Sequence, residues 1–152
     1  MQTFVPYPNI EKIASCLDDK RLGKQRVECF QILNTLHKRS YTPSDVYFSW
    51  KNHPAVLMWE GYEGFLNVYS IAMCEEWKKR GFNDSLSEKF EAPQTYEKPW
   101  WWGEEELHLS HQSKLLSKKY DHYKNFFSDV TPNLEYVWPI RSRKGVIKVY
   151  SF

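Results

Sequence analysis

Asp18–Lys38, with the sequence DDKRLGKQRVECFQILNTLHK, is the stretch that decides the fold. Apolar side chains recur in it at the spacing of a buried helix face. They are Leu22, Cys29, Leu33 and Leu36. A polar stripe follows the same spacing. It consists of Arg21, Lys24, Gln25 and Glu28. These patterns predict a helix that begins at Asp18 or Asp19 and ends near Lys38.

Gly23 interrupts this predicted helix. Glycine costs roughly 1 kcal/mol relative to alanine in a helix interior. Its presence predicts that another group approaches the backbone closely at this position.

The composition indicates one globular domain, which we expect to span residues 1–152. The chain is 41% hydrophobic and 17% aromatic, which excludes global disorder. It has no apolar run long enough to cross a membrane and no secretory pattern at its start, so we expect a cytoplasmic protein without membrane contact. Three scattered cysteines match neither a disulfide framework nor a zinc spacing. We expect no metal and no cofactor.

Other segments complete a mainly α prediction. Asn9 is suited to cap a short helix that ends near Leu17, and Pro54 to begin a helix that ends near Arg80. A third helix is predicted from Glu104 to Lys119, followed by one or two turns up to Phe127. Val146–Tyr150 alternates like a strand, so the C-terminal tail is predicted to be irregular or β.

The polar stripe allows two interpretations. Glu28 has the position of a general acid or base, but it is equally suited to an exposed ion pair with Lys24, worth about 0.3–0.5 kcal/mol. The basic stretch around it is suited to gripping phosphates or to forming a solvated helix face. This stretch contains Lys20, Arg21, Lys24 and Arg26. The net charge of +2 favours neither interpretation.

Aromatic and histidine residues give further candidates. Tyr96 and Trp100–Trp102 are expected to fill the core, with one ring lining a cleft. His53 is expected to cap the helix that begins at Pro54. His108 and His111 are candidates for contacts with phosphate or another substrate group. Glu105 and His108 form a single Glu-x-x-His motif, whereas a two-metal carboxylate site needs two such motifs.

Taken together, these residues resemble the pyrimidine dimer DNA glycosylase family of the phage endonuclease V type. Asp19–Glu28 resembles the first helix of that family, Glu76–Asn83 the end of its second helix, and His108–Ser117 its third. Four shorter segments resemble an uncharacterised bacterial branch. They are Gln2–Pro8, Leu17–Glu28, Asn52–Ala55 and His108–His111.

The resemblance implies a compact three-helix fold with the N-terminal arm threaded among the helices. It also implies glycosylase and lyase chemistry, in which the terminal α-amine attacks C1′ and a helix-borne carboxylate assists. Met1 carries the amine here and Glu28 matches the carboxylate. A free α-amine is partly neutral near pH 7, as this chemistry requires.

The chain departs from the family pattern at two places. The family nucleophile is a threonine exposed by removal of methionine, whereas Gln2 follows Met1 here and disfavours that removal. Basic positions that flank the family carboxylate are Val27 and Gln31 here. The family's grip on the lesion therefore does not carry over, and damaged or modified bases other than dimers become plausible substrates.

The leading hypothesis is a monomeric DNA glycosylase with AP lyase activity, cytoplasmic or virus-encoded. Two alternatives are a non-catalytic DNA-binding module of the same fold and an enzyme acting on a free nucleotide or other small molecule. Met1 and Glu28 are the catalytic candidates. The candidates for DNA contact are Arg21, Lys24, Gln25, Arg26, His53, His108, His111 and Lys114.

Overall fold

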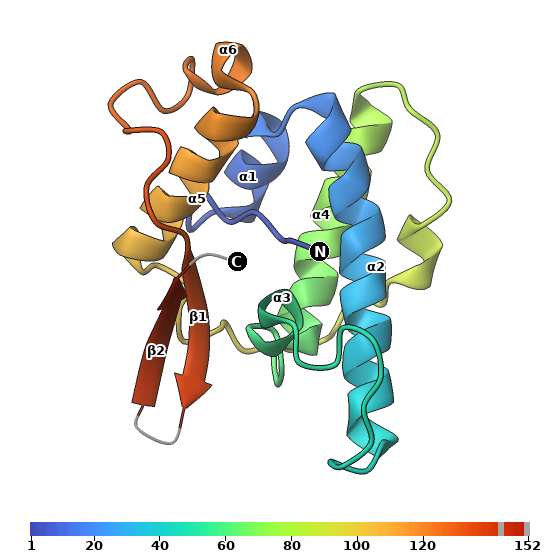
Figure 1. The fold of residues 1–152 in the computed structure, drawn as a ribbon. Helices are drawn as coiled ribbons and strands as arrows, with labels where there is room; N and C mark the ends of the chain where they lie inside the picture. The colour runs from blue at the N-terminus through green and yellow to red at the C-terminus, as the bar shows by residue number, and fades with distance from the viewer. Residues whose placement is uncertain (143–144, 151–152) are drawn as a thin grey trace. The chain divides into compact units, whose positions relative to one another are not determined.

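The chain is mainly helical, as the sequence predicts (Figure 1). The computed structural model describes residues 1–142 and 145–150. The elements are α1 (Ile10–Cys16), α2 (Asp19–Tyr41), α3 (Pro54–Leu57), α4 (Glu63–Lys79), η1 (Ser87–Lys89), α5 (Glu105–Lys118), α6 (Tyr120–Tyr123), β1 (Val137–Ser142) and β2 (Gly145–Tyr150). Among the residues described, none of these helices combines the length and apolar character needed to cross a bilayer.

The elements group into two units. The first unit consists of Met1–Thr3 and Asp19–Pro99, and the second of Phe4–Asp18 and the chain from Trp100 onward. The N-terminal arm therefore contributes its first three residues to one unit and the following residues to the other. The assignment of residues 1–152 to one domain stays a prediction.

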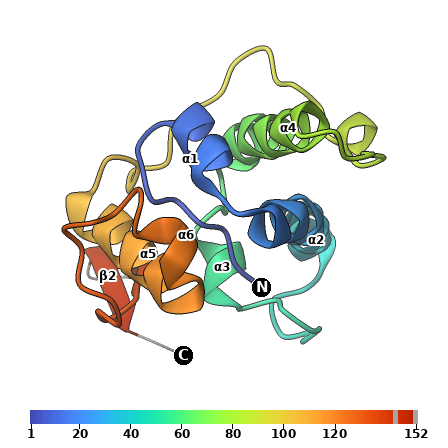
Figure 2. The ribbon, with the colours of Figure 1, turned by 90° about the horizontal axis from the view of Figure 1, so that it is seen from above.

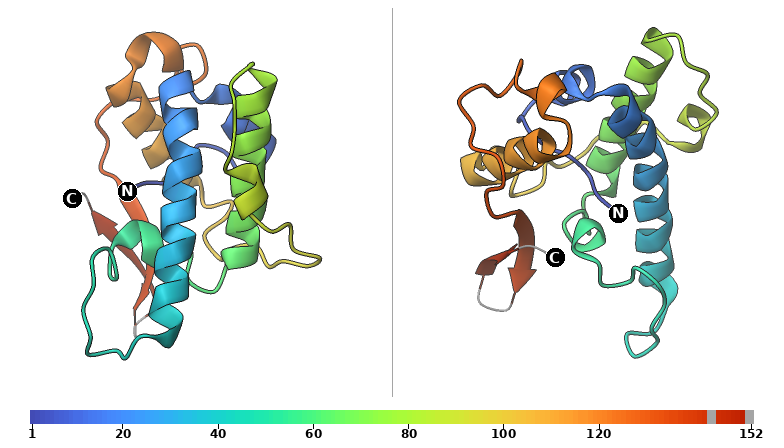
Figure 3. Two further views of the ribbon diagram at one scale, coloured as in Figure 1. Left: turned by 90° about the vertical axis from the view of Figure 1, so that its right-hand side faces the viewer. Right: turned by 45° about the horizontal axis from the view of Figure 1, so that its top comes forward.

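Helices α2 and α4 lie side by side in the first unit (Figures 2 and 3). The predicted apolar face of α2 is confirmed, because Leu22 and Cys29 are fully buried. The close approach predicted at Gly23 is also confirmed. A β-carbon at that position would lie 2.9 Å from Cη2 of Trp77 on α4.

The prediction of one helix from Pro54 to Arg80 is wrong. The structure divides this segment into α3 and α4, with turns between Leu57 and Glu63. Gly61 lies in this break with a φ of 88°, a conformation that glycine adopts without strain. Trp59, in the same break, is fully buried. The break therefore places the indole of Trp59 in the core of this unit.

In the second unit, α1 begins as predicted, since the Asn9 side chain accepts a hydrogen bond from the Lys12 amide at 2.9 Å. The end of α1 is joined to α6 through Tyr123. The Asp18 amide donates to the Tyr123 hydroxyl at 3.0 Å, and that hydroxyl donates to the Asp18 carboxylate. Burial and the Asp18 carboxylate raise the pKa of Tyr123, so the hydroxyl keeps its proton.

The C-terminal tail contains an antiparallel hairpin of β1 and β2, with Ile140 opposite Ile147. The predicted strand Val146–Tyr150 is thereby confirmed. The amide of Val137 donates to the Ser110 hydroxyl at 3.2 Å, which joins β1 to α5. Of the aromatic residues expected in the core, Trp101 is fully buried, whereas Tyr96 of the first unit is 51% exposed.

Candidate active site

The first three residues of the chain are held inside the first unit. Gln25 Nε2 donates to the Gln2 carbonyl at 2.8 Å, and Trp59 Nε1 donates to the Thr3 hydroxyl at 2.9 Å. Thr3 is fully buried. Within this unit the N-terminus lies beside α2 and α3 in each view (Figures 1 and 2). The α-amine of Met1, one residue before Gln2, therefore lies close to α2.

Gln25 is an internal anchor for the arm. Its side chain is 1% exposed and its amide is bonded to Gln2. We therefore do not assign Gln25, which was predicted to contact DNA, to a DNA interface. An extended arm has no helix or strand partner of its own, so its polar backbone groups require side-chain partners.

Glu28 follows Gln25 by three residues on α2, which places the two side chains on neighbouring turns of one helix face. Glu28 is half-buried. The carboxylate thus lies one helix turn from the residue that holds Gln2.

Glu28 also lines a groove formed by residues of α2 and by Trp77 of α4. The groove has a volume of about 470 Å³. It is lined by Asp19, Lys20, Gly23, Lys24, Arg26, Val27, Glu28, Gln31 and Trp77. Lys20 and Lys24 are exposed and give the groove two ammonium groups that are suited to contact phosphates.

Two predicted DNA contacts, Arg21 and Lys24, lie on the same stripe as Glu28. Arg21 is half-buried and Lys24 is exposed. Lys24 also lines the groove. Both side chains therefore stay candidates for contact with DNA.

Arg26, in contrast to Lys24, is engaged in contacts with other side chains of the first unit. Its guanidinium is ion-paired with Asp84 and lies over the Trp77 ring, 4.5 Å from the ring centroid. Burial raises the pKa of Asp84, but hydrogen bonds from Ser87, Leu86 and Arg26 outweigh it and lower the pKa below its ordinary value. Asp84 thus offsets the charge of Arg26, and we do not assign Arg26 to a DNA interface.

His53 caps α3, as the sequence predicts. Its Nδ1 accepts a hydrogen bond from the Ala55 amide at 3.0 Å. Burial lowers the pKa of His53, and the positive charge of the N-terminal amine lowers it further. The ring is therefore neutral near pH 7, and because Nδ1 is an acceptor, the proton resides on Nε2.

In the first unit the start of the chain is thus bonded to Gln25, one helix turn from Glu28, and its amine lies close enough to His53 to lower the pKa of that imidazole. A family model for pyrimidine dimer DNA glycosylase matches residues 1–89. The chain belongs to the pyrimidine dimer DNA glycosylase family. Membership supports a DNA glycosylase role with DNA as the substrate. Neither the curated proteins nor the solved structures contain a significant match to the chain.

The part of this family member that the family model matches contains Met1, Arg21, Lys24, Glu28 and His53. It ends before α5, so the resemblance of His108–Ser117 to a third family helix stays a prediction. All residues that line the groove, and both residues of the hydrogen bond from Gln25 to Gln2, also lie in the matched region.

His108 and His111, which were predicted to contact DNA, bind the backbone of the arm, and we do not assign them to a DNA interface. Both rings are buried in the second unit of this family member, with 5% and 0% exposed. His111 Nδ1 accepts the Val5 amide at 2.8 Å, and His108 Nδ1 lies 2.7 Å from the Val5 carbonyl. His108 Nε2 accepts the Gly103 amide at 3.0 Å, so its proton is on Nδ1 and is donated to Val5.

These two histidines are therefore neutral in opposite tautomers. Burial lowers the pKa of His111 to about 3, with a further contribution from His108. Burial also lowers the pKa of His108, although the Val5 carbonyl and Glu104 counteract part of that shift. Together the rings satisfy both backbone polar groups of Val5.

Two further residues of α5 differ in how well their roles were predicted. Gln112 Nε2 donates to the Pro6 carbonyl at 2.8 Å, an arm contact that sequence reasoning missed. Its position next to His111, in a helix facing an extended proline-rich arm, was the available signal. Lys114 is exposed, and its contact with DNA stays a prediction.

Proposed function

We propose that this chain is a DNA glycosylase with AP lyase activity, in which the Met1 α-amine is the nucleophile and Glu28 the assisting carboxylate. Family membership supports the glycosylase role. The hydrogen bond from Gln25 to Gln2 is the observation that carries the residue assignment. It holds the residue next to the amine on the same helix face as Glu28.

The proposed reaction begins when the neutral amine attacks C1′ of an extruded nucleotide. The bond from C1′ to the base breaks, and the base leaves with the electron pair and takes up a proton. The amine loses a proton, the bond from C1′ to O4′ breaks as O4′ is protonated, and an imine remains. Loss of a proton from C2′ then expels the 3′ phosphate by β-elimination.

Glu28 has two roles in this proposal. As a carboxylate it stabilises the positive charge that develops at C1′, and it transfers protons between the amine and O4′. His53 contributes a neutral Nε2–H donor near the amine. A donor with a fixed tautomer is suited to hold an oxygen of the sugar or the base.

We propose that Lys20, Arg21 and Lys24 contact the DNA backbone. Lys20 and Lys24 line the groove beside Glu28, where they can bind phosphates that flank the extruded nucleotide. Extrusion costs a few kcal/mol and costs least at a damaged pair. This arrangement favours damaged or modified bases as substrates.

Borohydride trapping tests the proposal. We expect a covalent adduct with DNA that contains an abasic site, a pyrimidine dimer or a modified base, and we expect mass spectrometry to map it to the N-terminal peptide. Glu28→Gln should remove the adduct. Glu75→Gln, which changes an exposed carboxylate on α4, should leave it unchanged.

Three results would contradict the proposal. The first is the absence of an adduct with all three DNAs, and DNA binding that Glu28→Gln does not affect would then point to a non-catalytic module. The second is an adduct that maps to a lysine. The third is full activity after two residues are added before Met1, because such an extension moves the amine away from Glu28.

A further inference from the structure

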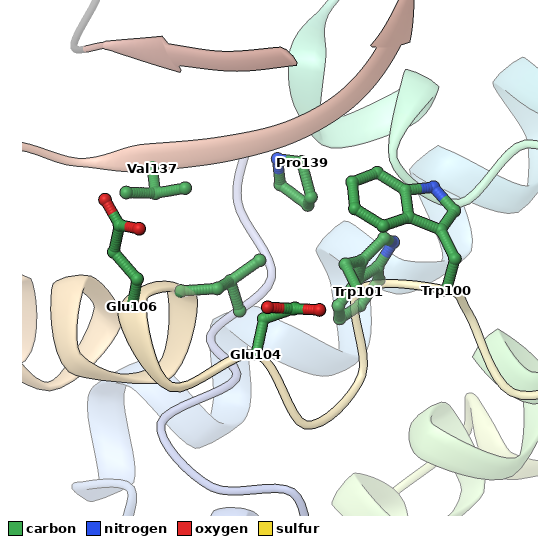
Figure 4. A pocket seen from close by; sticks show the side chains of 7 residues that line it. Trp100, Trp101, Glu104, Glu106, Val137 and Pro139 are labelled. Carbon is green, nitrogen blue, oxygen red and sulfur yellow. The ribbon is translucent and has the colours of Figure 1, made fainter. Parts of the chain in front are cut away.

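The second unit contains a pocket of about 250 Å³ that the proposed reaction does not use. It lies between the start of α5 and strand β1 (Figure 4). Leu107, Val137 and Pro139 give it apolar walls. Trp100 and Trp101 add two indoles, of which Trp101 is fully buried. Trp100 is half-buried, so the pocket is partly open to solvent on its side.

Two carboxylates, of Glu104 and Glu106, also line the pocket. In Figure 4 the Glu104 carboxylate lies near Trp101 and the Glu106 carboxylate near Val137. Among the described residues that line the pocket there is no lysine or arginine. The pocket thus combines aromatic rings with negative charge.

The helix dipole favours acidic residues at the start of α5 but does not determine which of them line the pocket. Glu104, Glu105 and Glu106 all stand at the start of α5, where negative charge is stabilised. The pocket is lined by the first and the third of them, whereas Glu105 is not among its lining residues. Glu105 therefore provides a matched control with the same helix position and no part in the pocket.

We propose that this pocket binds an organic cation, an alkylammonium or guanidinium group. The electron-rich faces of tryptophan rings attract such cations, most strongly where water is excluded. The carboxylates supply the opposite charge and accept hydrogen bonds from N–H groups. The same carboxylates repel phosphate, so this pocket is distinct in its chemistry from the cationic groove on α2.

Isothermal titration calorimetry with a matched pair of probes tests the proposal. Choline carries a quaternary ammonium, and 3,3-dimethylbutan-1-ol has the same shape without the charge. We expect saturable binding of choline and at least about tenfold weaker binding of the alcohol. Equal binding of the two, or no binding of choline, would overturn the proposal.

Variants then locate the site. Glu104→Gln keeps the shape of the side chain and should weaken choline binding about tenfold, whereas Glu105→Gln should leave it unchanged. Circular dichroism checks that both variants keep their helices. An equal effect of the two substitutions would overturn the assignment to this pocket.

A last comparison distinguishes the sources of the cation. Putrescine represents a free amine. Nα-acetyl-lysine N-methylamide, whose ε-ammonium is free and charged, represents a lysine side chain of a protein partner. Binding of either one, weakened by Glu104→Gln, supports the proposal and identifies the source. Because these titrations need neither DNA nor the Met1 amine, their outcome is independent of the trapping experiment.

Discussion

The two parts of the N-terminal arm are held by different chemistry. In the first unit an amide side chain, Gln25, donates to the Gln2 carbonyl. In the second unit two imidazoles bind Val5, with His111 accepting from its amide and His108 donating to its carbonyl. The amide of Gln25 does not titrate, so its hydrogen bond to Gln2 does not depend on pH. The hydrogen bonds of the imidazole pair require both rings to be neutral, because each ring uses one nitrogen as an acceptor.

We expect these two parts of the arm to have different roles, the first three residues in the reaction and the segment around Val5 in the stability of the fold. The Gln25 contact fixes the residue next to the amine, so its loss should be felt mainly in the rate of the reaction. The histidine pair satisfies a fully buried backbone, so its loss should be felt mainly in the stability of the fold. Breaking each contact in turn tests whether the roles are separate.

The largest effect is expected from Gln25→Leu. Leucine preserves an apolar helix face but cannot donate to Gln2, so the amine is no longer held in place. We expect the rate of borohydride trapping to fall about a hundredfold, since misplacing a reacting group by about 1 Å has that effect. The free energy of unfolding should fall by only about 0.5–1.5 kcal/mol. Single-turnover trapping and urea denaturation measure the two quantities.

Asn34→Leu is the matched control for this variant. It changes an exposed amide side chain on the same helix, outside the groove, and should alter neither quantity appreciably. If Gln25→Leu lowered stability strongly while the trapping rate of the folded protein stayed the same, the positioning role of Gln25 would be refuted.

His111→Leu should have the next largest effect, on stability. The substitution leaves the buried Val5 amide without its acceptor, which costs about 1–3 kcal/mol. Urea denaturation provides the measurement. His37→Leu, at an exposed position on α2, should change the free energy of unfolding by less than about 0.5 kcal/mol. Equal losses in the two variants would show that the imidazole contact does not contribute.

Much of the fold was predictable because its determinants are local. The spacing of Leu22 and Cys29 identified α2, and the residue types of Asn9 and His53 identified two helix caps. Glu28 was selected by the resemblance of Asp19–Glu28 to the first helix of the family, because the polar stripe alone left an ordinary ion pair open. Periodicity and capping depend on residues within a few positions of one another, so a sequence displays them directly.

Contacts that the sequence did not reveal are those in which a polar side chain bonds to a distant backbone group. Gln25, His108 and His111 were interpreted as surface groups because polar side chains are usually exposed. Their partners, Gln2 and Val5, lie in an extended arm that has no periodicity to reveal what it packs against. The break before α4 was missed for a different reason, since a buried Trp59 continues an apolar helix pattern while Gly61 interrupts it.

The smallest effect, a dependence of stability on pH, tests the histidine contact without any change to its structure at neutral pH. In the folded protein burial holds the pKa of His111 at about 3, whereas the ordinary value is 6.5. The unfolded chain therefore binds a proton below about pH 6.5 that the folded chain does not bind. Stability is fully present above that pH and falls as the pH decreases toward 3.

For His111 alone the loss between pH 7 and pH 6 should be roughly 0.7 kcal/mol, and His108 should add to it in the same direction. Carboxylates hardly titrate in this window, so the change can be attributed to histidines. Urea denaturation at the two pH values measures the loss, and His111→Leu should reduce it. A stability that stayed constant between pH 7 and pH 6 would mean that the rings are not held neutral, and the distinction between the two ends of the arm would fail.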